Sequence, residues 1–349
     1  MPGLIDPSSE LAKILLIGDQ GDGKTGAKAA LIAMGYKLLM IDTDRGFKIL
    51  RSLLTDPHYP YAAFMKKHGI NPAEPGRISY IPIDVPIDFT DVSVNRKGRA
   101  VNYSVLGPTS SAAWETVTKL LKEWKDTSDG KAISLGGIND WGPDTVLDFD
   151  TMSTLAELAK YWMQDMNGHL GAFEDDHGRD SGGAQELIMR LMTKLTNDAV
   201  KCNVIVTGHI KWVDMSNDVP QGIEERIREK KAIDAQGFPA VIGKATSPYI
   251  GKKFNDVFIV KREGNGSSLT RKIYSVPTNN TSAKNSVWLE PSYPLSTGLG
   301  EIFCALQYKD PPVELIKAIR GTTSTGKDTD VATSGSSPVA KSGFGFRPN

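Results

Sequence analysis

Apolar and polar positions follow two different periods along this chain. Short apolar runs bounded by Gly, Asp or Pro predict buried strands, and apolar residues at helical spacing predict helices between them. The expected strands lie at residues 14–17, 36–41, 78–83, 144–151 and 203–207, and the expected helices at 26–34, 110–125, 153–166 and 184–200. Strands that alternate with helices are typical of an α/β fold.

The C-terminal third is predicted to hold a β-hairpin and then a tail. Residues 257–260 form an apolar run that leads into Lys261 and Arg262, and residues 269–276 return after a Gly-rich turn, carrying Arg271. These basic residues indicate either ordinary protection of an edge strand or a functional basic edge. Pro312 to Arg320 predicts a short helix, and the Gly-, Ser- and Thr-rich sequence after it predicts disorder. We therefore expect one domain over residues 1–307, with residues 308–349 as helix and tail.

Composition bounds the possible functions. The 349 residues carry no formal net charge, with 40% hydrophobic and 23% charged residues. A chain with no global basic field would have to contact nucleic acid through a local patch. Its two cysteines have no metal-ligand spacing, and neither a signal peptide nor a membrane-spanning run is evident. We expect a cytoplasmic protein that is not embedded in a membrane.

The stretch KILLIGDQGDGKT, residues 13–25, contains the strongest motif. An apolar strand ends at Gly18, and G-x-x-x-x-G-K-[ST] follows directly before a predicted helix, which is the context of a phosphate-binding loop. The loop amides and the helix N-terminus bind phosphate, Lys24 reaches the β- and γ-phosphates, and the Thr25 hydroxyl holds Mg²⁺. The nucleotide-binding residues expected from the motif are Gly18, Asp19, Gln20, Gly21, Asp22, Gly23, Lys24, Thr25 and Gly26. The competing interpretation is a Gly-rich turn with an incidental lysine.

Other strands also end in polar residues. Residues 38–41 lead into Asp42-Thr43-Asp44, residues 146–149 lead into Asp150-Thr151, and residues 204–207 lead into Gly208-His209. The carboxyl ends of strands in an α/β sheet form its ligand-binding edge. A strand-end acid supports Mg²⁺ in nucleotide hydrolases, although Asp148 is an alternative to Asp150. The competing interpretation is that the acids are ordinary strand-end turn residues and that His209 is held by backbone groups.

Taken in order, these motifs resemble those of the RecA-like ATPases, especially the compact phage nucleotide-binding proteins related to single-strand annealing and recombination ATPases. The resemblance covers residues 13 to about 276 and rests on GDQGDGKT (18–25), LLMIDTD (38–44), VLDFDTMSTL (146–155) and VIVTGH (204–209). It implies a three-layer α/β/α fold with a central, mostly parallel sheet and a C-terminal β-hairpin.

The resemblance also implies a role for each strand end. Asp44 stands where the family has its catalytic glutamate and is one methylene shorter, Asp150 takes the metal position with Thr25, and His209 takes that of the γ-phosphate sensor. Catalytic residues are therefore expected to be Lys24, Asp44 and His209, with ATP and Mg²⁺ as cofactors.

Partners follow from the resemblance as well. Family members bind DNA through two loops, which correspond here to 167–183 and 211–243. Basic residues are concentrated in the second, at Lys211, Arg226, Arg228, Lys230 and Lys231. The implied ligand is single-stranded DNA, and the implied assembly is a homo-oligomer in which Lys261, Arg262 or Arg271 completes a neighbour's site.

Two other classes of function fit the same residues. A nucleoside or small-molecule kinase also uses a phosphate loop, and Arg226 and Arg228 would then belong to a lid over the donor. A non-hydrolysing binding protein would use nucleotide only to hold a conformation, because Asp44 would be too short to activate water. Phosphate transfer to an acceptor identifies the kinase, and ATP binding without turnover identifies the binding protein.

Overall fold

The computed structural model describes residues 11–84, 110–126, 132–168, 170, 177–214, 235–242, 246–278 and 280–321. An eight-stranded sheet runs through it in the order β12-β11-β10-β1-β7-β6-β2-β3. The six strands from β10 to β3 are parallel, and β11 and β12 continue the sheet antiparallel. The strands are β1 (Lys13–Gly18), β2 (Lys37–Asp42), β3 (Ile78–Pro82), β6 (Thr145–Asp150), β7 (Asn203–Gly208), β10 (Asp256–Glu263), β11 (Thr270–Tyr274) and β12 (Ser292–Pro294).

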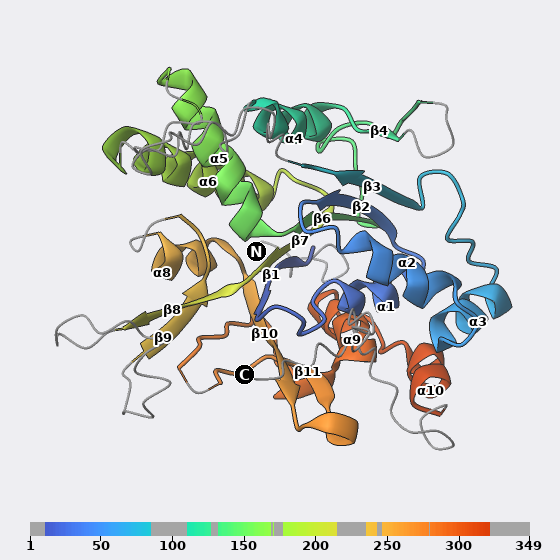
Figure 1. Cartoon of the computed structure of the whole chain (residues 1–349). Helices are drawn as coiled ribbons and strands as arrows, with labels where there is room; N and C mark the ends of the chain where they lie inside the picture. Colours follow the sequence, from blue (N-terminus) through green and yellow to red (C-terminus); the bar gives the residue numbers. More distant parts are fainter. Residues whose placement is uncertain are drawn as a thin grey trace, which may run out of the picture.

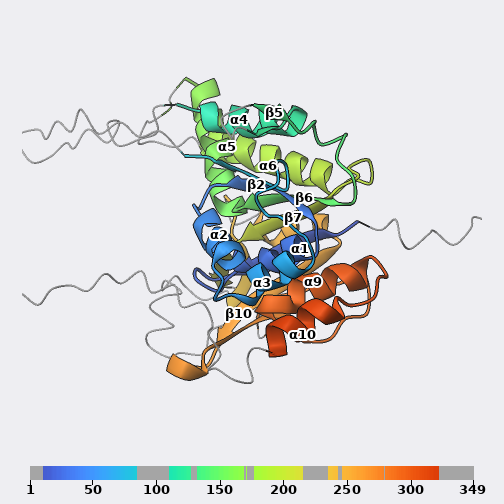
Figure 2. The same cartoon turned by 90° about the vertical axis from the view of Figure 1, so that its right-hand side faces the viewer.

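Helices cover both faces of this sheet, which confirms the expected three layers (Figures 1 and 2). One face carries α4 (Ala112–Lys122), α5 (Met152–Met166) and α6 (Gly182–Leu195). The other carries α1 (Ala29–Ala33), α2 (Phe47–Thr55), α3 (Pro60–Lys67), α9 (Leu295–Leu306) and α10 (Val313–Gly321). The single-turn elements are η2 (Gly26–Lys28), η4 (His177–Ser181), α8 (Ser247–Ile250), η5 (Gly251–Lys253) and η6 (Gly266–Ser268).

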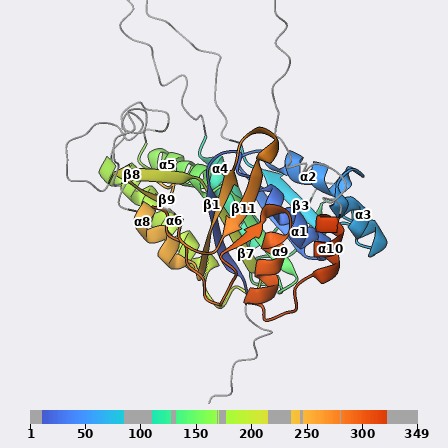
Figure 3. The ribbon, with the colours of Figure 1, turned by 90° about the horizontal axis from the view of Figure 1, so that it is seen from below.

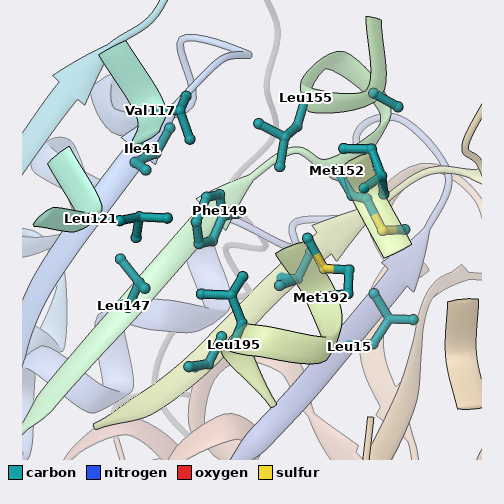
Figure 4. Packing of buried hydrophobic residues seen from close by; sticks show 14 of the residues in the cluster. Leu15, Ile41, Val117, Leu121, Leu147, Phe149, Met152, Leu155, Met192 and Leu195 are labelled. Carbon is teal, nitrogen blue, oxygen red and sulfur yellow. The ribbon is translucent and has the colours of Figure 1, made fainter. Parts of the chain in front are cut away.

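Along each parallel strand the side chains point alternately to the two faces of the sheet, so the core consists of two clusters. Leu15 and Ile17 pack with α4, α5 and α6, while Ile14 and Leu16 pack with α1 and α9. Strands β2 and β6 divide their apolar residues in the same way, so both faces of the sheet are buried. Figure 4 shows the first cluster, in which Phe149 of β6 lies among Leu121, Met192 and Leu195.

Two small ribbons extend the domain. Strands β4 (Lys125–Asp126) and β5 (Ile133–Ser134) pair beside α4, and β8 (Ile210–Asp214) pairs antiparallel with β9 (Ala235–Pro239). The β8–β9 ribbon lies to one side of the main sheet (Figures 1 and 3). It begins directly after His209, so residues 211–214 and 235–239 of the predicted second loop, 211–243, form strands and not loop.

Residues from distant parts of the chain meet at the centre of the sheet. Strand β10 pairs with β1 through a register that sets Gly18 opposite Val260, and β7 pairs with β1 on its other side. The carboxyl ends of β1, β7, β6 and β2 therefore lie together at one edge. The predicted hairpin is confirmed as β10–β11, and α10 confirms the predicted short helix. Among the described residues, no helix combines the length and apolarity that crossing a bilayer needs.

Candidate functional site

The phosphate loop connects β1 to η2, and its lysine side chain is hydrogen-bonded to carbonyl groups of the loop itself. Gly21 and Gly23 have φ angles of 81° and 97°, a region that glycine adopts without strain. The Lys24 Nζ donates hydrogen bonds to the carbonyl oxygens of Gly18 at 2.7 Å and Asp19 at 2.9 Å. Burial lowers the pKa of Lys24, against the attraction of nearby carboxylates. The side chain thus lies across the loop, where a phosphate could replace its carbonyl partners.

Thr25 and Asp150 are joined directly. The Thr25 hydroxyl donates to Asp150 Oδ2 at 2.6 Å, and the Thr207 hydroxyl donates to Asp150 Oδ1 at 2.6 Å. Burial alone would raise the pKa of Asp150, but Lys28 together with these two hydroxyls holds it below its ordinary range. A threonine that donates its proton to a carboxylate turns its oxygen lone pairs toward other ligands. The sequence left Asp148 and Asp150 as alternatives, and the contact with Thr25 favours Asp150.

Asp148 has a different partner, which the sequence did not reveal. Lys28 is fully buried, and its Nζ lies 2.6 Å from Asp148 Oδ2 and 3.0 Å from Asp150 Oδ2. The other oxygen, Asp148 Oδ1, is buried with no hydrogen-bond partner among the described residues. Burial raises the pKa of Asp148 to about 7, although Lys28 opposes this shift. The two acids raise the pKa of Lys28, so a charged lysine is held behind the loop.

Asp44 and His209 lie at the same edge of the sheet, as their strand-end positions predicted, and there they contact each other. Asp44 Oδ2 lies 3.3 Å from His209 Nε2, and their side chains are 43% and 31% exposed. Asp42 has a local task instead, because its carboxylate accepts from the amides of Gly46 and Phe47 at the start of α2. Asp44 is therefore the acid of this strand end that is accessible to solvent.

Gly46 contributes space that the sequence analysis overlooked. A Cβ atom added to Gly46 would lie 2.8 Å from the Thr25 hydroxyl oxygen and 3.2 Å from Asp150 Oδ2. The missing side chain leaves room beside the Thr25–Asp150 pair. Its position after an aspartate-rich strand end was the available signal.

The donor set at this place fits Mg²⁺ held mainly by a nucleotide. The described residues contain no group of three or more His, Cys, Asp or Glu that could hold a metal. Mg²⁺ usually keeps several waters and takes its other ligands from phosphates and one or two protein oxygens. Thr25, with Asp150 behind it and the space at Gly46, supplies that pattern.

The β10–β11 hairpin approaches the loop of its own chain. Arg262 Nε lies 3.0 Å from Asp22 Oδ1, and Arg271 Nε donates to the Gly21 carbonyl at 3.3 Å. Burial raises the pKa of Asp22, and Arg262 and Lys24 oppose that shift. Arg262 and Arg271 thus contact the loop of their own chain, and their expected role in a neighbour's site stays a prediction. Between the described residues of the loop and Lys261 there is no such contact, and its role in a neighbour also stays a prediction.

Of the two loops expected to bind DNA, only the second falls largely outside the described residues, and Arg226, Arg228, Lys230 and Lys231 belong to that part. In the first, residues 167, 168, 170 and 177–183 are described, and 177–183 is helical, in η4 and the start of α6, where the sequence predicted a loop. Lys211 lies on β8, in the described base of the ribbon. The His209 carbonyl accepts from the Ala240 amide at 2.7 Å, which ties the ribbon to the strand end that carries His209.

Comparison with known proteins gives structural similarity only. No protein-family model matches the chain, and no curated protein matches it in sequence. A KaiC-like protein from the hyperthermophilic archaeon Pyrococcus horikoshii is 13% identical over 82% of this chain and 85% of that chain, with a TM-score of 0.34. The RadB recombinase is 11% identical over 76% and 80%, with a TM-score of 0.33. The flagellar accessory protein FlaH from Methanocaldococcus jannaschii is 13% identical over 76% and 78%, with a TM-score of 0.32.

The three neighbours are thus a KaiC-like protein, a recombinase and a flagellar accessory protein. The α/β architecture follows from the chain's own strand pairing, and the site from its own side-chain contacts.

Proposed function

We propose that the chain is a RecA-like ATPase that binds Mg²⁺-ATP and acts on single-stranded DNA in phage recombination, repair or replication. The observation that carries the proposal is the 2.6 Å hydrogen bond from Thr25 in the phosphate loop to Asp150 at the end of β6. It joins a complete phosphate-loop motif to a strand-end acid, which is the arrangement that positions Mg²⁺ on a nucleoside triphosphate.

The other residues have roles that fit hydrolysis. The amides of Gly21 to Thr25 would surround the phosphates, with Lys24 turning from its carbonyl partners toward them. Mg²⁺ at Thr25 would offset the charge of the phosphate oxygens. Asp44 is the exposed acid beside His209 and would orient the attacking water or accept its proton.

His209 also links the site to the proposed DNA surface. Its carbonyl holds the base of the β8–β9 ribbon, and its ring contacts Asp44. A γ-phosphate that recruited either side chain would disturb this contact, and the ribbon would respond to nucleotide state. DNA as the ligand is supported by the family resemblance and by the basic residues of the segment that the ribbon carries.

The Asp44–His209 contact also favours a second candidate, a non-hydrolysing nucleotide switch. A carboxylate engaged by His209 at 3.3 Å, on a side chain shorter than glutamate, would be poorly placed to activate water. Such a protein would bind ATP and change the ribbon without turnover.

ATP hydrolysis measured with and without single-stranded DNA separates these candidates. For the ATPase we expect turnover that single strands stimulate, and a fall of at least about a hundredfold in kcat for Lys24→Ala and for Asp44→Ala. Lys48→Ala, an exposed lysine on α2, is the control and should keep wild-type turnover.

Two results would contradict the ATPase. Tight ATP binding with no turnover and no response to DNA would leave the nucleotide switch, and phosphate transfer to an added nucleoside would identify a kinase. Asp44→Glu gives a further comparison, because restoring the methylene should retain or raise turnover only if Asp44 acts on water.

A further inference from the structure

Two arginines of the β10–β11 hairpin point at the phosphate loop. Arg262 and Arg271 stand directly opposite each other in the antiparallel register. Like charges at opposed positions destabilise a strand pair unless other groups compensate them. Here the compensation comes from the loop, through the Asp22 carboxylate for Arg262 and the Gly21 carbonyl for Arg271.

Close packing holds the hairpin against the loop. A Cβ atom on Gly23 would lie 2.5 Å from Leu295 Cδ2 and 3.2 Å from Arg271 Cδ, so glycine is needed for this approach. Arg271 is only 8% exposed. The Lys24 ammonium and the two guanidinium groups thus bring three positive charges to one loop.

Asp22 is the opposing charge, and its position is unusual for a site that binds an anion. Its side chain is 5% exposed, with Oδ2 accepting from the Asp19 amide at 2.8 Å and Oδ1 facing Arg262 Nε at 3.0 Å. A carboxylate fixed in a phosphate loop repels a polyphosphate and occupies donors that the polyphosphate could use. It therefore weakens the binding that the rest of the loop favours.

Resting on the proposed nucleotide binding, we propose that Asp22 is an internal competitor for Arg262 and that this ion pair sets the affinity of the loop for nucleotide. When a triphosphate binds, the guanidinium of Arg262 leaves the Asp22 carboxylate for a phosphate oxygen. Arg262 suits this exchange because its side chain is 48% exposed, whereas Arg271 is buried against the loop. The ligand class is a nucleoside polyphosphate, and the arginine comes from the same chain.

A double-mutant cycle tests the exchange. The measurement is the Kd of ATP by isothermal titration at fixed Mg²⁺ and ionic strength, for wild type, Asp22→Asn, Arg262→Gln and the double variant. Removing the competitor should tighten binding about tenfold, and removing the guanidinium should weaken it about tenfold. If Asp22 acts by competing for Arg262, its removal releases nothing in the Arg262→Gln background, so the Kd of the double variant should lie within about threefold of that of Arg262→Gln, whereas independent effects would add up to the wild-type Kd.

Controls separate charge from folding. Lys272→Gln removes a positive charge from the same hairpin, where Lys272 pairs with Glu263 at 3.0 Å, and should leave the Kd within about twofold of wild type. Asp22→Ser is a second way to remove the competitor and should also tighten binding. Circular dichroism melts confirm that each variant is folded. Because Arg262 is half exposed, the effect of each charge should shrink at high salt.

The outcomes distinguish a failure of the proposed function from a failure of the competitor role of Asp22. If wild type binds no ATP, the proposed function itself is wrong. If wild type binds ATP but both Asp22 variants weaken or do not change binding, the proposed function stands and the competitor role is overturned, because the ion pair would then only hold the loop in shape.

Discussion

Lys28 and Lys13 are both buried lysines, and they lie near opposite ends of the parallel strands of the sheet. Lys28 stands at the carboxyl edge, where its Nζ meets the carboxylates of Asp148 and Asp150 at 2.6 and 3.0 Å. Lys13 starts β1 at the amino edge, and its Nζ donates to the carbonyls of Val200 at 3.0 Å and Cys202 at 2.6 Å. One buried cation is paired with charge and the other with dipoles.

The pKa values of the two lysines reflect this difference. Burial acts to lower both, but the two acids raise the pKa of Lys28 above its ordinary range. Burial lowers the pKa of Lys13 to about 8, and carbonyl partners do not compensate. A lysine that carboxylates hold in its charged form balances the acids at a ligand-binding edge. A buried lysine with a pKa near 8 is a structural residue that makes the free energy of unfolding depend on pH. The burial of a lysine alone therefore does not identify a functional site.

Replacing Lys28 should give the largest effect. Lys28→Met leaves two buried carboxylates without their cation, which typically destabilises a protein by about 3–5 kcal/mol. Urea unfolding followed by circular dichroism measures the free energy of unfolding. Lys28→Met combined with Asp148→Asn removes the lysine and its nearer carboxylate, and should recover more than half of the loss because Asp150 keeps the Thr25 and Thr207 hydroxyls. A Lys28→Met variant as stable as the exposed-site control Lys317→Met would show that the carboxylates do not need Lys28.

Thr207 tests the carboxylate side of the same cluster with a smaller change. Thr207→Val keeps the shape of the side chain but removes the hydroxyl that donates to Asp150 Oδ1 at 2.6 Å. A hydrogen bond to a charged group is worth about 1.5–3 kcal/mol, so the free energy of unfolding should fall by about 2 kcal/mol. Thr207→Ser retains a donor and should lose clearly less. No loss in Thr207→Val together with a loss in Thr207→Ser would mean that the methyl packing, and not the hydroxyl, stabilises β7.

Local sequence was sufficient for the elements and for much of the site. Apolar runs predicted β1, β2, β6 and β7, and their polar ends predicted that Asp44, Asp150 and His209 would lie at one edge of the sheet. These predictions worked because the parallel strands of an α/β sheet align their carboxyl ends. The role of each residue in catalysis remains a proposal.

The remaining features depend on contacts between distant segments. Lys28 follows Lys24 by one helical turn in an alanine-rich stretch, and only the register of β6 beside β2 and β7 shows that two acids face it. The contacts of Arg262 and Arg271 with the phosphate loop likewise depend on the pairing of β10 with β1, which nothing in the local sequence shows. Local periodicity carries no information about either pairing.

Lys13 gives the smallest effect and depends on pH. Its pKa is about 8 in the folded protein and near 10.5 when the chain is unfolded. Between these values the unfolded chain binds more protons, so the free energy of unfolding rises with pH. Below pH 8 the buried ammonium carries its full cost, and that cost is relieved as the pH passes through the folded pKa. From pH 7 to pH 9 the gain should be about 1.4 kcal/mol.

The measurement is the free energy of unfolding of wild type minus that of Lys13→Met across this range, because groups that titrate in both proteins cancel. The difference should shift in favour of wild type as the pH rises, and the same comparison with the exposed Lys317→Met should stay flat. Lys28→Met offers the contrasting case: carboxylates hold Lys28 charged throughout, so the deficit of this variant should not shrink by this route between pH 7 and pH 9. If wild type gained nothing over Lys13→Met, the Val200 and Cys202 carbonyls would be holding the ammonium as firmly as the carboxylates hold Lys28, and the distinction between the two edges would fail.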